Sequence, residues 1–169
     1  VRVRPAFRDP AARLEVELPS AALARAWSPR PGSASWDRIG GVLLLGSTEP
    51  PGVLGPGSFH HQILERMGGT PAVEEGSPWM ELDAEDILRL APGAIVLVAP
   101  RGAGAGAGDP GEAEMLGRLG KIGELDIPAV RSGRVGLIDH PLALTPSTAM
   151  VDFAEELAGL LDRWAGERP

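Results

Sequence analysis

The sequence predicts an α/β fold, a three-layer lobe in which a mainly parallel open sheet has helices on both faces. Two short runs, residues 42–45 and 94–99, are wholly apolar, which is typical of strands buried on both faces of a parallel sheet. Segments with apolar residues at helical spacing separate and follow these runs, and such alternation favours a parallel sheet. The length of 169 residues corresponds to about one domain.

The first part of the chain is predicted to stand apart from this lobe. Residues 13–18 alternate between apolar and charged side chains, as a half-buried edge strand does. Residues 20–27 suit a short helix, and residues 28–35 are rich in proline, glycine and serine, as linkers are. We therefore expect an N-terminal extension over residues 1–39 and the α/β lobe over residues 40–165.

The lobe is predicted to begin with the strand at residues 42–45, followed by a loop over residues 47–57 that is rich in proline and glycine. Ser58 is a suitable N-cap for a helix that runs to Met67. The two glycines after Met67 are expected to end that helix. A short strand is expected at residues 70–73.

The middle of the lobe continues the alternation of helices and strands. Asp83 is a suitable N-cap for a helix over residues 84–90, which leads into the strand at residues 94–99. A run of glycine and alanine occupies most of residues 101–110. A further helix is expected over residues 112–119.

The last part of the lobe is predicted to contain two strands and a long helix. The strands are expected at residues 127–130 and 134–138. Thr145 is expected to cap the helix, with Pro146 at its first position. The apolar stripe of this helix consists of Met150, Phe153, Leu157, Leu160, Leu161 and Trp164.

Composition and charge exclude several classes of function. The chain contains no cysteine, which excludes disulfides, thiolate metal sites and cysteine nucleophiles. Its net charge of −7 disfavours binding to nucleic acid. The longest apolar runs are far too short to cross a membrane, so no membrane insertion is expected. No signal peptide is visible, and the residues themselves do not identify a compartment.

Catalysis, nucleotide binding and metal binding are each weakly supported. Residues 102–108 match only a weak phosphate-binding pattern, and a flexible surface loop explains this run better. No pattern assigns catalytic roles, so we expect neither an enzyme nor a cofactor. His60, His61 and His140 suggest a metal site as an alternative. Neighbours on a helix point about 100° apart, however, so His60 and His61 do not readily share one ion.

Two side chains each have two interpretations. Trp79 is expected to lie in a loop before the helix cap at Asp83. It is either a stacking platform for a flat ligand or a plug over the core. The residues alone leave both open. Glu85 lies in the first turn of its helix, where an acidic residue complements the helix dipole. The other interpretation of Glu85 is an exposed contact for an arginine of a partner, and the residues alone favour the first.

An ordered series of short segments resembles one known family. The segments are Gly57-Ser58-Phe59, Gly68-Gly69, Pro78-Trp79, residues 83–88, residues 91–97, residues 127–135 and the final helix. Together they resemble the C-terminal lobe of the class III periplasmic substrate-binding proteins of ABC importers for cobalamin, haem and iron-siderophores. The resemblance covers about residues 40–165.

The resemblance implies a non-enzymatic component that captures cobalamin or a ferric siderophore and delivers it to an ABC permease. Trp79 matches a tryptophan that contacts the ligand, and Glu85 matches a glutamate that contacts arginines of the permease. Residues 50–59 and 139–145 match segments that face the ligand, in agreement with the rule that ligands bind at the carboxyl ends of parallel strands. The implied ligand-binding residues are Trp79, Pro51, Val53, Leu54, Ser58, Phe59, His140 and Thr145.

The chain also departs from the family. Its members have two lobes joined by a long helix, with the ligand between the lobes, and residues 1–39 match neither the other lobe nor that helix. We therefore expect a fragment or a shortened relative, with a separate or missing N-terminal lobe as a further partner. The resemblance implies a periplasmic or extracytoplasmic location. The alternative function is a metal-ion-binding receptor lobe that uses His60 or His61 with His140.

Overall fold

A computed structural model describes residue 24, residues 28–100 and residues 111–166 of the chain. The predicted strand at 13–18, all but one residue of the predicted helix at 20–27, and the glycine–alanine run lie outside them. The strands are β1 (Val42–Thr48), β2 (Pro51–Leu54), β3 (Trp79–Glu81), β4 (Ala94–Ala99) and β5 (Val135–Asp139). The helices are η1 (Ser33–Arg38), α2 (Phe59–Met67), α3 (Ala84–Leu90), α4 (Glu112–Leu119), η2 (Gly120–Glu124), α5 (Pro128–Arg131) and α6 (Ala149–Gly166).

The described strands form a five-stranded sheet in the order β3-β2-β1-β4-β5. β1, β4 and β5 are parallel, with Leu44 opposite Val96 and Val96 opposite Gly136. β2 is antiparallel to both of its neighbours, β1 and β3. Every strand except β2 therefore runs in the same direction, which confirms the prediction of a mainly parallel sheet.

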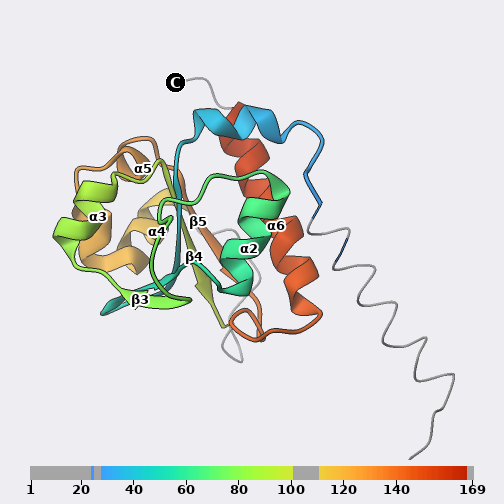
Figure 1. The fold of residues 1–169 in the computed structure, drawn as a ribbon. Coiled ribbons are helices and arrows are strands. Elements are labelled where there is room, and N and C mark those ends of the chain that lie inside the picture. Colours follow the sequence, from blue (N-terminus) through green and yellow to red (C-terminus); the bar gives the residue numbers. More distant parts are fainter. Residues whose placement is uncertain (1–23, 25–27, 101–110, 167–169) are drawn as a thin grey trace, which may run out of the picture.

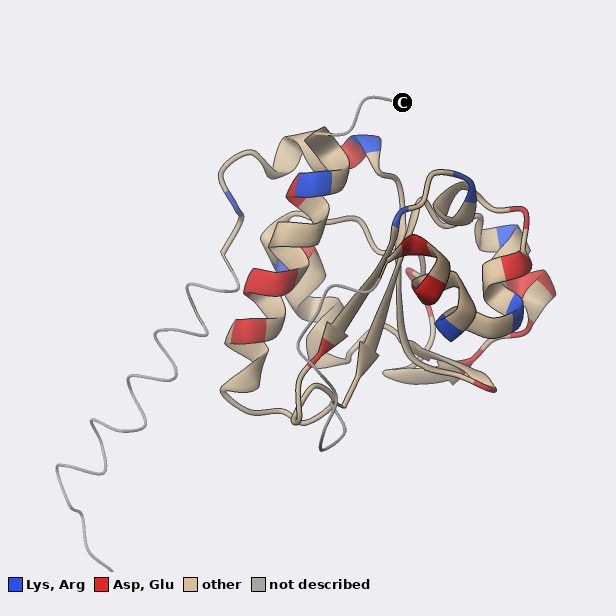
Figure 2. Cartoon of the chain, turned by 180° about the vertical axis from the view of Figure 1, so that it is seen from behind, with Lys and Arg blue, Asp and Glu red and all other residues tan. Residues whose placement is uncertain are grey.

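Each face of the sheet is covered by its own set of helices (Figure 1). Leu44 and Val96 point into a core formed with η1, α2 and α6. Leu45 and Ile95 point into the opposite core, formed with α3, α4, η2 and α5. This alternation arises because successive strand residues point to opposite faces. Most charged residues lie on the helices and loops, and the strands β1, β2 and β4 contain none (Figure 2). The predicted three-layer α/β lobe is confirmed.

Side-chain caps begin two of the predicted helices. Ser58 precedes α2, and its Oγ accepts a hydrogen bond from the backbone N–H of His61 at 3.2 Å. Asp83 precedes α3, and its Oδ1 accepts from the N–H of Asp86 at 2.8 Å. α2 ends at Gly68, whose φ of 96° is left-handed and therefore suits glycine. These boundaries agree with the predictions.

Three local predictions are wrong. Residues 51–54, predicted as part of a loop, form β2, because Val53 pairs with Leu45 of β1 and with Met80 of β3. Pro51 is tolerated there because it occupies the first strand position. Residues 127–130, predicted as a strand, lead into the short helix α5, which has Pro128 at its start. A short apolar run does not by itself distinguish the two structures. Residues 70–73 form no strand, and only an isolated bridge joins Pro71 to Val42.

The final helix begins later than predicted. α6 starts at Ala149, and the Oγ of Ser147 accepts the N–H of Ala149 at 3.2 Å. The backbone N–H of Thr145 instead donates to the carbonyl of Leu142 at 2.9 Å, within a series of turns. Thr145 and Pro146 therefore do not cap the helix. The predicted apolar stripe is buried along α6.

Residues before the predicted domain boundary contribute to the lobe. Trp36 is buried in the core beside α6, and its Nε1 donates to Asp162 Oδ1 at 2.8 Å. Arg30 Nη2 lies 2.6 Å from Glu155 Oε1 on the same helix. A separate extension over residues 1–39 stays a prediction, because most of residues 1–27 lie outside the described part. Within the described residues, none of the helices has the length and hydrophobicity that crossing a bilayer requires.

Candidate ligand-binding edge

The carboxyl ends of β1, β4 and β5 meet at one edge of the sheet, at the bottom of Figure 1. The start of α2 and the segment between β5 and α6 lie at the same edge. Ligands of open α/β sheets bind outside the carboxyl ends of the strands. The structure therefore brings parts of both segments that the resemblance assigns to the ligand, residues 50–59 and 139–145, to one side of the molecule.

The prediction that Trp79 lies in a loop is wrong. Trp79 is the first residue of β3 and pairs with Leu54 of β2. Its indole ring lies against the backbone of two glycines on neighbouring strands. A Cβ added to Gly52 would lie 2.3 Å from Trp79 Cζ2, and one added to Gly46 would lie 2.6 Å from Cζ3. Only glycine therefore permits this close approach.

The position of Trp79 combines the two interpretations made from the sequence. The same added Cβ on Gly46 would lie 3.4 Å from Leu54 Cδ2, so the ring packs beside a buried leucine. Trp79 nevertheless remains 47% exposed. A ring held on one side against the sheet and open on the other is suited to stacking on a flat ligand.

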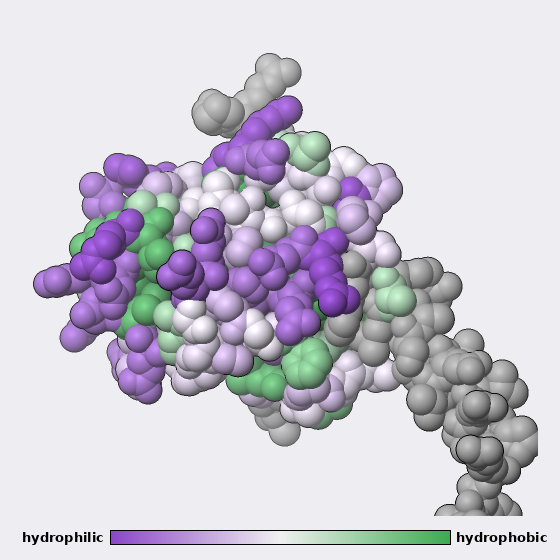
Figure 3. Space-filling model, in the orientation of Figure 1, coloured by the Kyte–Doolittle hydropathy of each residue, from purple (hydrophilic) through white to green (hydrophobic). Residues whose placement is uncertain are grey.

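Two more large apolar side chains are exposed at this edge. Phe59 is 43% exposed at the first position of α2, and Leu142 is 45% exposed in the segment after β5. Figure 3 shows apolar surface at the lower margin of the molecule, over the start of α2 and this segment. Exposed apolar surface that gathers in one place commonly marks a binding surface.

A hollow of about 510 Å³ adjoins the ends of β1 and β4. This volume is within the range of small-molecule sites. The guanidinium of Arg118 at its rim pairs with Glu114 at 2.8 Å. Its described lining consists of Gly46, Ser47, Thr48, Glu49, Leu97, Ala99, Gly117, Arg118 and Gly120. Sequence reasoning missed Leu97, Ala99 and the α4 residues, although the position of Ala99 at the end of an apolar strand was a usable signal.

Four of the predicted ligand contacts are buried or half-buried in this structure. Val53 is only 1% exposed and packs on the opposite face of the sheet from Trp79, so it presents no surface to a ligand at this edge. Leu54 is buried next to the Trp79 ring. Ser58 is buried, and its hydroxyl is engaged as the cap of α2. Pro51 is half-buried at the start of β2.

The remaining predicted contacts lie in the segment after β5. His140 is half-buried, and its Nδ1 accepts the N–H of Leu142 at 3.1 Å. Its Nε2 lies 3.7 Å from Asp152 Oδ2 on α6. Thr145 is exposed. Both residues remain candidates for ligand contact at this edge.

The three histidines are engaged separately. His60 Nε2 lies 2.6 Å from the carbonyl of Ala143, and His61 Nε2 lies 2.9 Å from the carbonyl of Val73. Because a carbonyl only accepts, both Nε2 atoms carry protons in these contacts. The described part of the chain contains no group of three or more His, Asp or Glu side chains placed to hold a metal ion. The geometry therefore does not support the alternative metal site.

The burial of His60 predicts that the stability of the protein depends on pH. Burial lowers the pKa of His60 below 6.5, although its hydrogen bond to Ala143 acts in the opposite direction. The unfolded chain therefore takes up the proton first, and stability is lost as the pH falls from 6.5 through the lower folded pKa. We expect urea unfolding midpoints to fall over this range. His60→Gln should make the unfolding midpoint depend less on pH, whereas the control His140→Gln should not. Equal slopes of midpoint against pH in wild type and His60→Gln would contradict the assignment to His60.

Glu85 is exposed in the first turn of α3. Neighbouring Asp83 caps the helix, and Asp86 pairs with Arg89 at 2.8 Å. Glu85 is thus an exposed acidic residue in the first turn of α3. This position is compatible with both interpretations, namely complementing the helix dipole and contacting an arginine of a partner.

Neither a protein-family model nor a curated protein matches the sequence. Solved structures do match the fold. A possible iron-binding periplasmic solute-binding protein from Staphylococcus epidermidis has a TM-score of 0.65 at 16% identity, covering 89% of this chain and 54% of its own. The periplasmic vitamin B12 binding protein BtuF of Vibrio cholerae has a TM-score of 0.60 at 14% identity, with coverages of 88% and 52%.

A third match is the periplasmic heme-binding protein BhuT in complex with two hemes, with a TM-score of 0.58 at 18% identity and coverages of 89% and 56%. The chain thus spans about half the length of these solved structures. At such identities the likeness concerns the fold. The described chain has the fold of a single lobe of two-lobed periplasmic solute-binding proteins.

Proposed function

We propose that this chain is a lobe of the substrate-binding component of an ABC importer. It captures cobalamin or a ferric siderophore at the edge where Trp79, Phe59 and Leu142 are exposed, and it works outside the cytoplasm. The observation that carries the proposal is the half-exposed indole of Trp79, held against Gly46 and Gly52 on a sheet of this fold. The solved structures of similar fold include proteins named for vitamin B12, heme and Fe3+-hydroxamate.

The chemistry of the edge suits a large, flat or chelated ligand. An aromatic ring fixed on one side loses little conformational freedom when a ligand stacks on its other side. Phe59 and Leu142 add apolar surface from two further elements. The adjoining hollow offers the hydroxyls of Ser47 and Thr48, and the Ser47 Oγ already donates to the carbonyl of Pro50 at 2.7 Å. Such a mixture of apolar area and a few polar groups is usual in ligand sites.

Replacing Trp79 by alanine tests the proposed site. Calorimetric titration of the whole chain with cyanocobalamin, haemin and a ferric hydroxamate should detect binding of at least one of them. Trp79→Ala should weaken that binding about tenfold or more, since it removes the stacking surface. The matched control is Leu88→Ala, because Leu88 is 44% exposed but lies on α3. A folded protein that binds none of the three ligands, or equal losses in both variants, would overturn the proposal.

Glu85 is the proposed contact with the permease. The support is its exposed position on the outer surface of the lobe, where a charge mainly affects orientation and encounter rate. Glu85→Gln should leave ligand binding unchanged and reduce association with the permease reconstituted in lipid nanodiscs. Unreduced association in Glu85→Gln would remove this residue from the proposed interface.

A further inference from the structure

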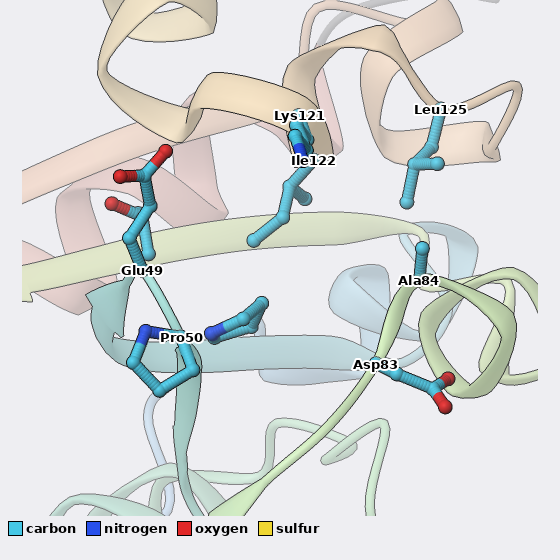
Figure 4. A pocket seen from close by; sticks show the side chains of 9 residues that line it. Glu49, Pro50, Asp83, Ala84, Lys121, Ile122 and Leu125 are labelled. Carbon is cyan, nitrogen blue, oxygen red and sulfur yellow. The ribbon is translucent and has the colours of Figure 1, made fainter.

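A second hollow, of about 380 Å³, lies beside the turn between β1 and β2 and shares Thr48 and Glu49 with the first hollow. We call it the turn pocket. Figure 4 shows residues of this turn facing η2 and the start of α3 across it. Its lining consists of Thr48, Glu49, Pro50, Pro51, Asp83, Ala84, Lys121, Ile122 and Leu125.

The turn pocket has an apolar floor and wall. Ile122 is buried in the core beneath α3 and α4, and Leu125 is half-buried next to it. Pro50 lies on the opposite side in Figure 4, and Pro51 also lines the pocket. Rigid apolar side chains from separate elements favour the apolar body of a small ligand, and the volume is at the lower end of the range for small-molecule sites.

Two opposite charges at this pocket have no partner within the described part of the chain. Among the residues that the structure describes, Lys121 and Glu49 make no side-chain hydrogen bond or ion pair. Asp83 is different, because its carboxylate caps α3 at 2.8 Å and points away from Lys121 in Figure 4. Among the described lining residues, the charges without a partner are therefore one ammonium and one carboxylate. A ligand of a single sign would leave one of them facing a like charge.

We propose that the turn pocket binds a small zwitterion, an α-amino acid with an apolar side chain. The ligand carboxylate pairs with Lys121, and the ligand ammonium pairs with Glu49. The ligand side chain packs against Ile122 and Leu125. The turn pocket shares Thr48 and Glu49 with the hollow at the edge. Its apolar part lies elsewhere, since Ile122 belongs to the core on the opposite face of the sheet from Leu54, which pairs with Trp79. This site does not depend on the proposed transport function.

Lys121 is the only lysine in the chain, so it can be labelled selectively. Reductive methylation with ¹³C-formaldehyde preserves the positive charge and gives one lysine signal in NMR spectra, with the amino-terminal amine as an internal reference. Leucine should shift the Lys121 signal saturably, with a dissociation constant on the order of 1 mM. Glu49→Gln should weaken binding about fivefold. Glu124→Gln, an exposed change at the end of η2, is the matched control.

Three analogues test which ligand groups matter. Glycine lacks the apolar side chain, leucinamide lacks the carboxylate and isovalerate lacks the ammonium, so each should bind at least fivefold more weakly than leucine. Trp79→Ala should leave the leucine titration unchanged, which separates this site from the one at the edge. No saturable shift with leucine up to about 50 mM would overturn the proposal. Equal binding of isovalerate would also overturn it, by showing a simple anion site.

Discussion

Replacing Gly52 by alanine is expected to push Trp79 off the sheet and to abolish most of the ligand affinity proposed for this edge. The new Cβ would lie 2.3 Å from Trp79 Cζ2 and 2.6 Å from Ser47 Oγ. Both atoms belong to side chains that can move, so the indole leaves its position while the sheet remains intact. We expect a loss of affinity of about tenfold or more, as for Trp79→Ala, and a stability cost of about 1–3 kcal/mol.

A double-mutant cycle distinguishes displacement of the ring from general damage. In the double variant Gly52→Ala/Trp79→Ala the clash with the ring is absent, so part of the stability should return. Gly159→Ala is the matched control, because a Cβ at that position in α6 meets nothing within 4 Å. Urea unfolding and calorimetry measure the two effects. If Gly52→Ala retains full ligand affinity, the contact of the Trp79 ring with Gly46 and Gly52 does not position Trp79 for binding.

Replacing Phe153 by alanine is expected to cost about 3–5 kcal/mol of unfolding free energy. Phe153 is 1% exposed in the core between the sheet, α2 and α6. Its ring meets the His60 imidazole edge-to-face, with centroids 4.8 Å apart. The substitution removes the transfer free energy of the ring and leaves a cavity. Since small domains are stable by only about 5–15 kcal/mol, the variant should be near its unfolding threshold at room temperature.

The same chain offers a matched phenylalanine for comparison. Phe59 is 43% exposed, so Phe59→Ala should cost about 1 kcal/mol or less. Urea unfolding followed by circular dichroism gives both values. If Phe153→Ala costs no more than Phe59→Ala, the packing of α6 against the sheet described above is wrong.

The central strands and the capped helices could be predicted because each has a local cause. Residues 42–45 and 94–99 are apolar without interruption, and both became buried strands. Ser58 and Asp83 supply oxygens that accept backbone N–H groups at the starts of α2 and α3. These signals act over a few residues and do not need the rest of the fold.

The wrong predictions concern segments whose structure depends on distant partners. β2 begins at the second residue of a proline pair and contains Gly52, so its local preference for a strand is weak. It exists because Val53 pairs with Leu45 on one side and Met80 on the other. α5 is a single helical turn whose Ala129 is buried against the sheet. The start of α6 is decided by the turns after β5, in which His60 holds the carbonyl of Ala143.

The sequence by itself determined the α/β class, the mainly parallel sheet, the burial of the α6 stripe and the identity of Trp79 as a residue of interest. Only the tertiary structure decided how Trp79 is held. Its ring packs against Gly46 of β1 and Gly52 of β2, and the pairing of β1, β2 and β3 places these glycines next to it. The turn pocket likewise joins residues about seventy positions apart, Glu49 and Lys121. Hydrophobic periodicity and helix capping depend on residues close together in the sequence. A binding site depends on side chains from distant segments, which strand register and the packing of the layers bring together.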